Sequence, residues 1–492
     1  MQHFLKHLRL FLILIVSLLL FLISCSKKEE STSSTVTCAS SRTLTASTKV
    51  PLLVVRVQYA NATFQSSQTT WADKMFGTSD GQLNHYLDET TYGKYQFTPA
   101  TETSGCTNDG VVTVSMAENH PDTQGNSWAC YAATAITAAD SSVNFSAYDT
   151  DSNGKLSVAE LQVIFLVAGG ESAQSINSPG GVWGQAGSLT CDVNGDGGIL
   201  DEPCGSTPDN CHGVTLDSVR MLGKTSSTYG QNGFSQFGER QGSSSTNTWD
   251  ATIGVMAHEL GHAYFDLPDL YDTSATGSGI GYFGLMGSGS WGYKSLSENS
   301  GATPVHLSAW SKEKIGACVP QTVDNGTTNI TLPAVYQSII DAASCGIYKA
   351  TTSTSDEYFL FENRSPGGYD RGLYLKILYG SADSIYSNND NLYAGGVAIW
   401  HVKDILSSCS NVSTNNCEAQ SPKLVDLEEA NNGDLDNGSS KGRTTHLFYS
   451  GNSVTFNNSS TPNSKLYDNS SSGISATSII AAGDSMTLTI SK

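Results

Sequence analysis

Two histidines four residues apart, in the stretch VMAHELGHAYFDLPDLYD, constrain this 492-residue chain more than any other feature. The apolar residues of the stretch follow helical spacing and predict a helix with one face in a core; they are Ile253, Met256, Leu260 and Ala263. His258 and His262 stack on the opposite face, where two imidazoles can hold one zinc ion. Glu259 lies between them, placed to take a proton from a water that zinc activates. The alternative is a surface helix that carries two histidines by chance.

The aspartates that follow this helix are candidates for a third metal ligand. They are Asp266, Asp269 and Asp272. The pair Leu267-Pro268 predicts the end of the helix, because a residue before proline avoids helical geometry. Asp266 is one turn beyond His262 and reaches the metal only if the helix continues straight. The residues alone leave the three candidates open.

A second segment, DTDSNGKLSVAE (residues 149–160), has the spacing of an EF-hand calcium loop. A glycine stands at position 6 and oxygen-bearing residues fill the ligand positions, which are Asp149, Asp151, Asn153, Lys155 (through its carbonyl), Ser157 and Glu160. The apolar run at residues 161–170 follows closely, so the segment predicts a structural calcium site that pins a loop to the core. The alternative is a solvated acidic turn.

A third segment, DVNGDGGILDE, starts in the same way with Asp192, Asn194 and Asp196. Pro203 stands where the closing glutamate of an EF-hand loop belongs, so the segment predicts either a second calcium loop closed by another acid or no calcium loop.

The N-terminus predicts export. Residues 1–24 have a basic start and one apolar run, which is typical of a secretory signal segment and too short to favour a membrane-spanning helix. The sequence Leu-Ile-Ser-Cys resembles a bacterial lipobox, which implies cleavage before Cys25 and lipidation of its sulfur; the alternative is an ordinary signal with an incidental cysteine. We therefore expect a protein anchored by lipid to the cell envelope, at the outer membrane in a two-membrane bacterium, or one released extracellularly.

Charge excludes one class of partner. The formal net charge is −20, and phosphate binding needs a basic surface, so nucleic acid is not expected as a partner. The same charge suits a protein that meets divalent cations. Ten cysteines remain if Cys25 carries lipid, and in an oxidising compartment they favour disulfides between near neighbours. The local groups are Cys106 and Cys130; Cys191, Cys204 and Cys211; Cys318 and Cys345; Cys409 and Cys417.

Composition divides the rest of the chain. Residues 25–48 are rich in serine and threonine and predict a flexible tether. A buried strand at residues 50–60, a helix that ends near residue 93 and a buried strand at residues 161–170 predict an α/β core within 49–320. Short alternating runs separated by turn residues predict a β-rich, sandwich-like region at 321–492; they are EYFLFENR, GGVAIWHV, HLFYSG and SMTLTIS.

HELGHAYFDLPDLYDT, followed by FGLMGSGSWG, resembles the immune inhibitor A family of secreted zinc metallopeptidases. Blocks at 303–316, 357–364, 395–402 and 446–451 resemble that family in the same order, so the likeness runs from Val50 to Lys492. It implies a metzincin-like fold of the α/β (α+β) class, an acidic third zinc ligand, a methionine turn at Met286 and peptide-bond hydrolysis. The chain departs from the family pattern, because Phe265 replaces a glycine and one extra residue precedes Asp269.

With this resemblance we predict Asp269 as the third zinc ligand, since the family's aspartate also follows the proline, and keep Asp266 as the alternative. Asp272 is then better placed to hold a histidine. Tyr282 and Tyr293 are weaker candidates for stabilising an oxyanion, and we expect His306 and His401 to be hydrogen-bonded histidines rather than ligands. The predicted protein is a calcium-stabilised, lipid-anchored zinc endopeptidase that acts on proteins or peptides. Its alternative is a surface-binding lipoprotein that uses the same scaffold without catalysis.

Overall fold

The computed structural model describes residues 46–123, 128–187, 189, 214–221, 233–337, 345–379, 394–404, 417–419, 421–431 and 433–492. These residues belong to one compact unit, Thr45–Lys492. The predicted signal segment, Cys25 and nearly all of the predicted tether lie outside them, as do Asp192, Asn194 and Asp196. None of the helices in the described ranges is long and apolar enough to cross a lipid bilayer.

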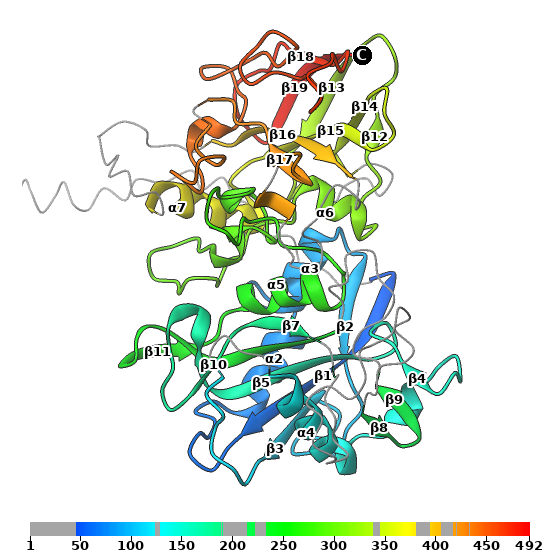
Figure 1. Ribbon diagram of the computed structural model, residues 1–492, viewed down its shortest axis with the longest axis vertical. Helices are drawn as coiled ribbons and strands as arrows, with labels where there is room; N and C mark the ends of the chain where they lie inside the picture. Colours follow the sequence, from blue (N-terminus) through cyan, green and yellow to red (C-terminus); the bar gives the residue numbers. More distant parts are fainter. Residues whose placement is uncertain are drawn as a thin grey trace, which may run out of the picture. The chain divides into compact units, whose positions relative to one another are not determined.

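A mostly parallel, eight-stranded sheet forms the first part of the fold (Figure 1). Its main path runs β11-β10-β5-β1-β2, while β3, β6 and β7 pair with β1, β5 and β10. The strands are β1 (Thr48–Gln58), β2 (Tyr95–Pro99), β3 (Val111–Ser115), β5 (Gln162–Glu171), β6 (Gly181–Val182), β7 (Gln185–Gly187), β10 (Phe234–Ser244) and β11 (Asn247–Asp250). The two predicted buried strands are confirmed as β1 and β5, and they are parallel neighbours.

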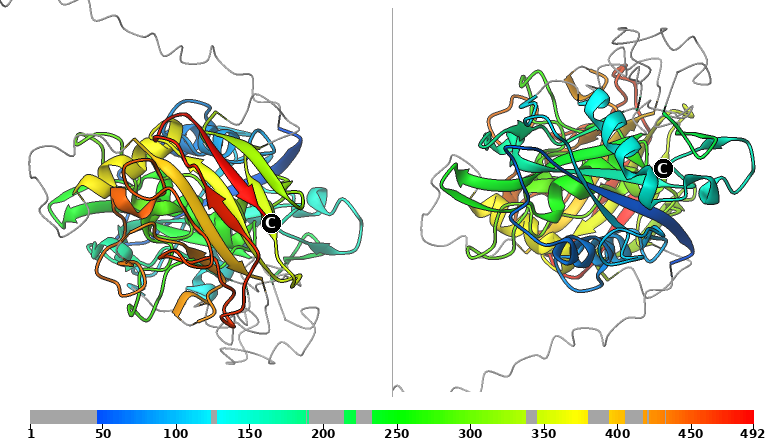
Figure 2. Two further views of the ribbon diagram at one scale, coloured as in Figure 1. Left: turned by 90° about the horizontal axis from the view of Figure 1, so that it is seen from above. Right: turned by 90° about the horizontal axis from the view of Figure 1, so that it is seen from below.

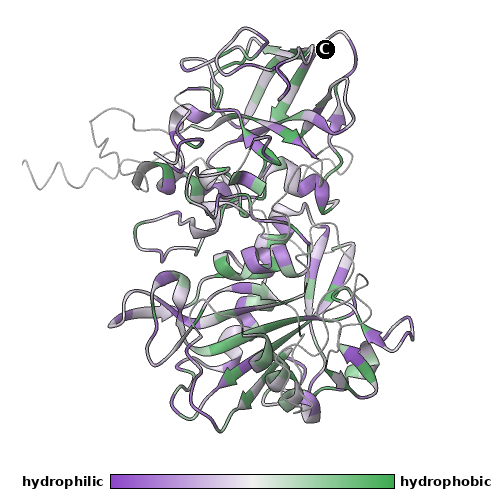
Figure 3. Ribbon diagram, viewed as in Figure 1, coloured by the Kyte–Doolittle hydropathy of each residue, from purple (hydrophilic) through white to green (hydrophobic). Residues whose placement is uncertain are grey.

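Both faces of this sheet are covered by helices. Alternate residues of β1 point to opposite sides, as strand geometry requires. Leu52 and Val54 join a core with α2 (Gln68–Phe76), α3 (Leu83–Thr90) and α5 (Ile253–Ala263). Leu53, Val55 and Val57 face α4 (Ala129–Ala139). The central strands are therefore hydrophobic along most of their length, as Figure 3 shows, which is expected of a parallel sheet buried on both sides.

The C-terminal part is built mainly of antiparallel strands, as predicted. One sheet has the order β12-β14-β15-β16-β17 and another β13-β19-β18. Their bounds are β12 (Gln321–Thr322), β13 (Thr327–Pro333), β14 (Tyr348–Thr351), β15 (Glu357–Arg364), β16 (Gly396–Lys403), β17 (Val425–Leu427), β18 (Ser475–Thr477) and β19 (Ser485–Ser491). Three of the four alternating runs are strands. The fourth, residues 446–451, was wrongly predicted: it makes only isolated bridges, such as Val397 to Phe448.

The two C-terminal sheets share one hydrophobic core. Phe359 and Ile399 from the first sheet pack with Ile330, Leu488 and Ile490 from the second. The left view of Figure 2 looks onto them, with β19 in red over the yellow and orange strands. The remaining elements are the small sheet β4 (Lys155–Leu156), β9 (Val219–Met221) and β8 (Thr215–Leu216), and the helices α6 (Ala309–Lys314) and α7 (Arg371–Tyr379).

Only part of the predicted cysteine pairing is correct. Cys318 and Cys345 form a disulfide, with their Cα atoms 5.6 Å apart, so this near-neighbour pair is confirmed. Cys106 is free and exposed, which excludes a bond with Cys130. Cys130 and Cys417 are each disulfide-bonded as well. The other cysteines lie outside the described ranges.

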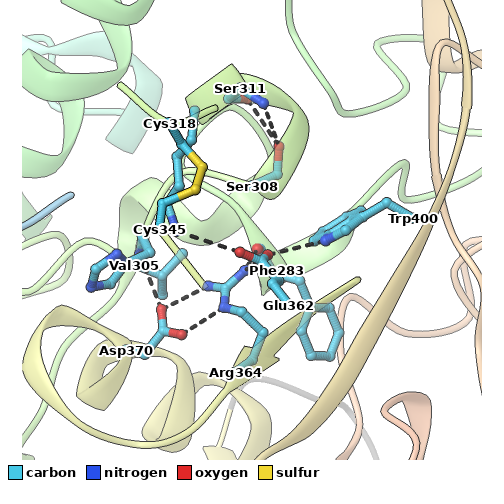
Figure 4. Close-up of polar contacts among 12 residues, drawn as sticks. Phe283, Val305, Ser308, Ser311, Cys318, Cys345, Glu362, Arg364, Asp370 and Trp400 are labelled. Carbon is cyan, nitrogen blue, oxygen red and sulfur yellow. Dashed lines mark hydrogen bonds and ion pairs between the residues drawn. A yellow bond between two sulfur atoms is a disulfide. The ribbon is translucent and has the colours of Figure 1, made fainter. Parts of the chain in front are cut away.

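A buried ionic network ties the C-terminal sheets to the segment that contains Met286 (Figure 4). Arg364, at the end of β15, donates to both carboxylate oxygens of Asp370, at 2.6 and 2.7 Å, and to the carbonyl oxygen of Phe283. Asp370 also accepts the backbone amide of His306 at 3.1 Å. Arg364 and Asp370 have no solvent exposure. Their buried bonds therefore attach the C-terminal part of the chain to the segment around Phe283 and Met286.

Candidate metal centre

Helix α5 carries the two histidines through the interior of the protein. All its residues are buried, so it is not the surface helix of the chance alternative. It packs against β10 and β7 on one side and against residues 288–291 on the other. Gly254 is required at this contact, because a Cβ atom there would overlap the carbonyl oxygen of Ser290. Gly261 gives the same room to the sulfur of Met286, which is buried and packs under the helix as predicted for a structural methionine.

Three potential ligand atoms converge at the end of α5. His258 Nε2 lies 3.0 Å from Asp269 Oδ1, and His262 Nε2 lies 3.2 Å from the same oxygen. The two imidazole Nε2 atoms are 3.2 Å apart. All three side chains are buried, at 8, 5 and 5% exposure. Two imidazole nitrogens and one carboxylate oxygen around a single point form the three-donor set that a catalytic zinc ion uses, so the residues fit that metal.

Backbone carbonyls orient both imidazoles. His258 Nδ1 lies 2.9 Å from the carbonyl oxygen of Leu285, and His262 Nδ1 lies 2.5 Å from that of Leu267. Each Nδ1 therefore donates its proton, which leaves the Nε2 lone pairs directed at the shared point. The expected role of Asp272 is wrong. Its carboxylate accepts backbone amides of its own turn instead, including that of Thr276 at 2.8 Å.

The extra residue before Asp269 is absorbed in a widened last turn of the helix. The amide of Phe265 bonds to Leu260 O, five residues back, at 3.2 Å, and that of Leu267 bonds to Gly261 O at 2.9 Å. Such a π-type turn holds one residue more than an α-turn. Asp266 then takes the left-handed conformation, φ 55°, that usually selects glycine after a helix. Asp266 does not join the converging ligand atoms.

Asp269 is held as an anion. Burial alone would raise its pKa, but the two histidines keep the pKa of this carboxyl well below its usual range. Tyr271, two residues on, donates its hydroxyl to Asp269. Burial, followed by the nearby Asp269 and Glu259 carboxylates, raises the pKa of Tyr271 far above its usual value, so the phenol stays protonated.

A cleft of about 210 Å³ lies beside these residues, with Glu259 in its wall. His258, Tyr271 and two tryptophans, Trp183 and Trp291, also line it. Glu259 is 7% exposed and accepts the backbone amide of Ala186 in β7. Burial raises the pKa of Glu259 to about 8. It is thus a poorly solvated carboxylate next to the ligand set, not a member of it, and suits proton transfer.

A second buried carboxylate holds the part of the wall that contains Gly184. Glu171, at the end of β5, has no solvent exposure, and it accepts the amides of Gly184 at 2.9 Å and Gly238 at 3.0 Å. Burial raises the pKa of Glu171 to about 7. Gly184 lines the cleft, so Glu171 holds that wall in place without entering it.

Tyr271 was missed from the sequence, and the tyrosines that were considered do not line the cleft. The ammonium group of Lys376 lies over the rings of both Tyr282 and Tyr293 instead. A usable signal was present, because Tyr271 stands between Asp269 and Asp272 in DLYD. His306 and His401 are hydrogen-bonded to Glu89 and Glu357, as expected for structural histidines.

The predicted calcium loop, residues 149–160, folds so that its carboxylates converge. Oxygen atoms of Asp149, Asp151 and Glu160 come within 4.8 Å of one another. Gly154, at φ 75°, makes the sharp turn and donates its amide to Asp149 at 2.9 Å. Glu160 folds back over the loop, where its two oxygens accept the amides of Thr150 and Ser157, each at 3.0 Å. Asn153 lies in the same turn, Lys155 is the first residue of β4, and Ser157 follows β4 directly, before β5 begins at Gln162.

Residues 221–319, which contain His258, Glu259, His262 and Asp269, match the family model of the immune inhibitor A peptidase M6 catalytic domain. This part of the chain is therefore similar to the catalytic domain of the immune inhibitor A family. A stretch of 66 residues, 13% of the chain, is 46% identical to the pre-pro-metalloprotease PrtV of two Vibrio cholerae serotype O1 strains, M66-2 and ATCC 39315 / El Tor Inaba N16961. The chain matches 7% of the length of these relatives. The wider likeness to the immune inhibitor A family, from Val50 to Lys492, stays a prediction.

Proposed function

We propose that this protein is a zinc-dependent endopeptidase with His258, His262 and Asp269 as the metal ligands. The observation that carries the proposal is the convergence of their three ligand atoms, all within 3.2 Å of one another, at a cleft with Glu259 in its wall. The match of residues 221–319 to a peptidase catalytic domain and the likeness to a metalloprotease support a peptidase that uses a metal. Protein or peptide substrates follow from the same class of enzyme.

In the proposed reaction, zinc supplies the Lewis acidity that polarises the scissile carbonyl and activates water. Glu259 takes the proton of the attacking water and returns it to the nitrogen of the leaving amine. Its weak solvation favours both transfers, because a carboxylate with a raised pKa is a stronger base and can then act as an acid. Tyr271 holds Asp269 in place through its hydroxyl.

The proposed fold is metzincin-like, followed by a C-terminal β-sandwich. A mostly parallel sheet that packs on the helix of the two histidines, and a methionine packed against Gly261 of that helix, support the first part. The common core of the two C-terminal sheets supports the second. The proposed domains keep the predicted bounds, 49–320 and 321–492.

Calcium is proposed to stabilise the protein at Asp149, Asp151, Asn153, Lys155, Ser157 and Glu160. The support is the convergence of three carboxylates around a tight turn with glycine at its sharpest point. A second calcium loop at Asp192, Asn194 and Asp196, closed by another acid, is proposed from the sequence alone.

Export and anchoring through Cys25 are proposed from the sequence alone. Lipidated chains with more than one acyl group stay membrane-bound. Fractionation of cells that express the full chain should place the wild type with membranes and Cys25→Ser in the soluble fraction. Equal membrane binding of the two proteins would refute this anchor.

Substitution of Glu259 by glutamine tests the catalytic proposal against the non-catalytic alternative. Purified wild type should degrade casein, and a chelator should stop it until zinc is restored. Glu259→Gln should lose activity by about 100-fold or more while keeping the zinc content of the wild type, because Glu259 transfers protons and does not bind the metal. Zinc-loaded wild type that degrades no protein would favour the surface-binding lipoprotein.

A further inference from the structure

The cleft beside Glu259 has a cationic residue in its wall that comes from the C-terminal part of the chain. Lys441 lines the cleft together with Glu259 and Tyr271, although it is far from both in the sequence. Its backbone is fixed, because its carbonyl oxygen accepts the amide of Tyr282 at 2.7 Å.

The loop that carries Lys441 is attached at a second point. The amide of Ser278 donates to the carbonyl oxygen of Leu435 at 2.7 Å. Gly281 must remain small between these two bonds, because a Cβ atom there would overlap the carbonyl oxygen of Lys441. The loop 433–443 thus packs along residues 278–282. These bonds fix the backbone of Lys441 beside the cleft.

No carboxylate in the described part of the chain neutralises the charge of Lys441. Its side chain is exposed, and no carboxylate of the described ranges pairs with it, although the chain has a net charge of −20. Two other lysines of the C-terminal part behave differently, since Lys423 pairs with Asp426 at 2.9 Å and Lys403 with Glu357 at 2.9 Å. Lys376 adds positive charge near Lys441: burial, and then Lys441 itself, lower the pKa of Lys376 to about 8.

Two tryptophans complete the recognition surface. Trp183 is 45% exposed, which is unusual for so large an apolar side chain, and Trp291 is half-buried. Both line the same cleft as Lys441. Aromatic walls bind apolar stems, and an unpaired ammonium group binds an anion. The combination matches a carboxylate at the end of a short hydrocarbon chain.

We propose that Lys441 makes this enzyme selective for peptides that carry a carboxylate beside the cleaved bond. The inference rests on the proposed peptidase function and names its substrate class. The carboxylate can belong to an Asp or Glu side chain or to the C-terminus of the peptide. An ion pair at a partly exposed site corresponds to a preference of about fivefold.

The experiment compares kcat/KM for a set of fluorogenic peptides. They differ only in one residue, Glu, Gln or Lys, placed in turn at each position around the cleaved bond, and each is made with a free and an amidated C-terminus. Zinc-loaded wild type should prefer Glu over Gln at one position by about fivefold, less at high salt. The ratio should fall to about one in Lys441→Gln, survive in Lys441→Arg, and turn toward Lys in Lys441→Glu. Lys465→Gln, which removes an exposed lysine outside the cleft, should keep the wild-type ratio.

The outcomes separate the inference from the function on which it rests. A preference that follows the internal Glu assigns a side-chain carboxylate, and one that needs the free C-terminus assigns the terminal carboxylate; both support the proposal. Equal cleavage of all peptides by the wild type overturns the inference and leaves the peptidase intact. An acid preference that persists in Lys441→Gln overturns the role of Lys441. Wild type that cleaves none of the peptides and no casein overturns the proposed function itself.

Discussion

At the scale of single residues, the third metal ligand is the sharpest question. Asp269 lies within 3.2 Å of both imidazole Nε2 atoms, whereas Asp266 sits in a left-handed turn outside the group. We predict that Asp269→Ala loses most of its zinc during dialysis and that Asp266→Ala keeps about one zinc per chain. Zinc measured by atomic absorption in both purified variants decides the matter. Loss of zinc from Asp266→Ala alone would reverse the assignment.

His401 gives a second residue-scale prediction, for stability against pH. Its imidazole donates to Glu357 at 2.9 Å and to Glu428 at 3.1 Å, and it stacks between the rings of Phe359 and Tyr467. Burial opposes its charge, but the two carboxylates, with a further contribution from Asp426, raise the pKa of His401 to about 9.

Because the folded pKa lies above the unfolded value, this stabilisation is complete below about pH 6.5 and is lost as pH rises through about 9. The unfolding free energies of wild type and His401→Gln should therefore differ by about 3 kcal/mol more at pH 6 than at pH 10. Urea denaturation at several pH values measures both unfolding free energies. Subtracting one from the other at each pH cancels the contribution of groups that titrate in the same way in both proteins. A gap that does not change with pH would contradict the prediction.

At the scale of elements, the sequence predicted secondary structure correctly where a single hydrophobic periodicity extends over a whole segment. The apolar runs of β1 and β5, the alternation of β15 and β16, and the helical spacing of α5 each arise from local geometry. The prediction failed at residues 446–451, where an alternating run is held by isolated bridges and not by a ladder.

The parts of the site that could not be predicted depend on contacts across long stretches of chain. The widened turn after His262 is set by how Leu267 and Pro268 leave the helix, and no residue in it signals a π-type bond. Lys441 reaches the cleft only because a loop docks on residues 278–282. Cys106 and Cys130 are near in sequence, but only the fold decides that they do not bond to each other.

The loop between Asp149 and Glu160 carries the element-scale prediction. Three carboxylates converge there, so calcium should bind the folded state and stabilise it. Saturating calcium should raise the Tm of wild type by a few degrees, corresponding to about 2–3 kcal/mol at 100 times the Kd. In Glu160→Gln the shift should shrink, while Glu118→Gln, at an exposed acid, should keep it. An equal calcium shift in all three proteins, measured by calorimetry, would exclude this loop as the site.

At the scale of the whole molecule, buried bonds connect the C-terminal sheets to the segment that packs under the candidate metal centre. Arg364 connects β15 to Phe283 and Asp370 through bonds that are buried from solvent. Arg364→Leu leaves Asp370 buried without its cation, so it should lower the unfolding free energy by about 3–5 kcal/mol. Chemical denaturation measures the loss.

Arg371 is the matched control for that prediction. Its guanidinium pairs with Asp80 at 3.3 Å but is 43% exposed, so Arg371→Leu should cost less than about 1 kcal/mol. The double variant Arg364→Leu with Asp370→Leu should recover part of the loss, because it removes the unpaired charge. If Arg364→Leu and Arg371→Leu have equal effects, the network does not support the site.

The anchoring of both imidazoles to backbone carbonyls limits how this centre can evolve. The oxygens of Leu285 and Leu267 orient the rings whatever side chains those positions carry. A mutation can replace a side-chain partner but cannot delete a peptide carbonyl, so two of the three ligand orientations are shielded from point mutation. Mutations that change metal affinity by reorienting a ligand should therefore fall mainly at Asp269 and Tyr271. There a single nucleotide change can remove the hydrogen bond from the Tyr271 hydroxyl to Asp269.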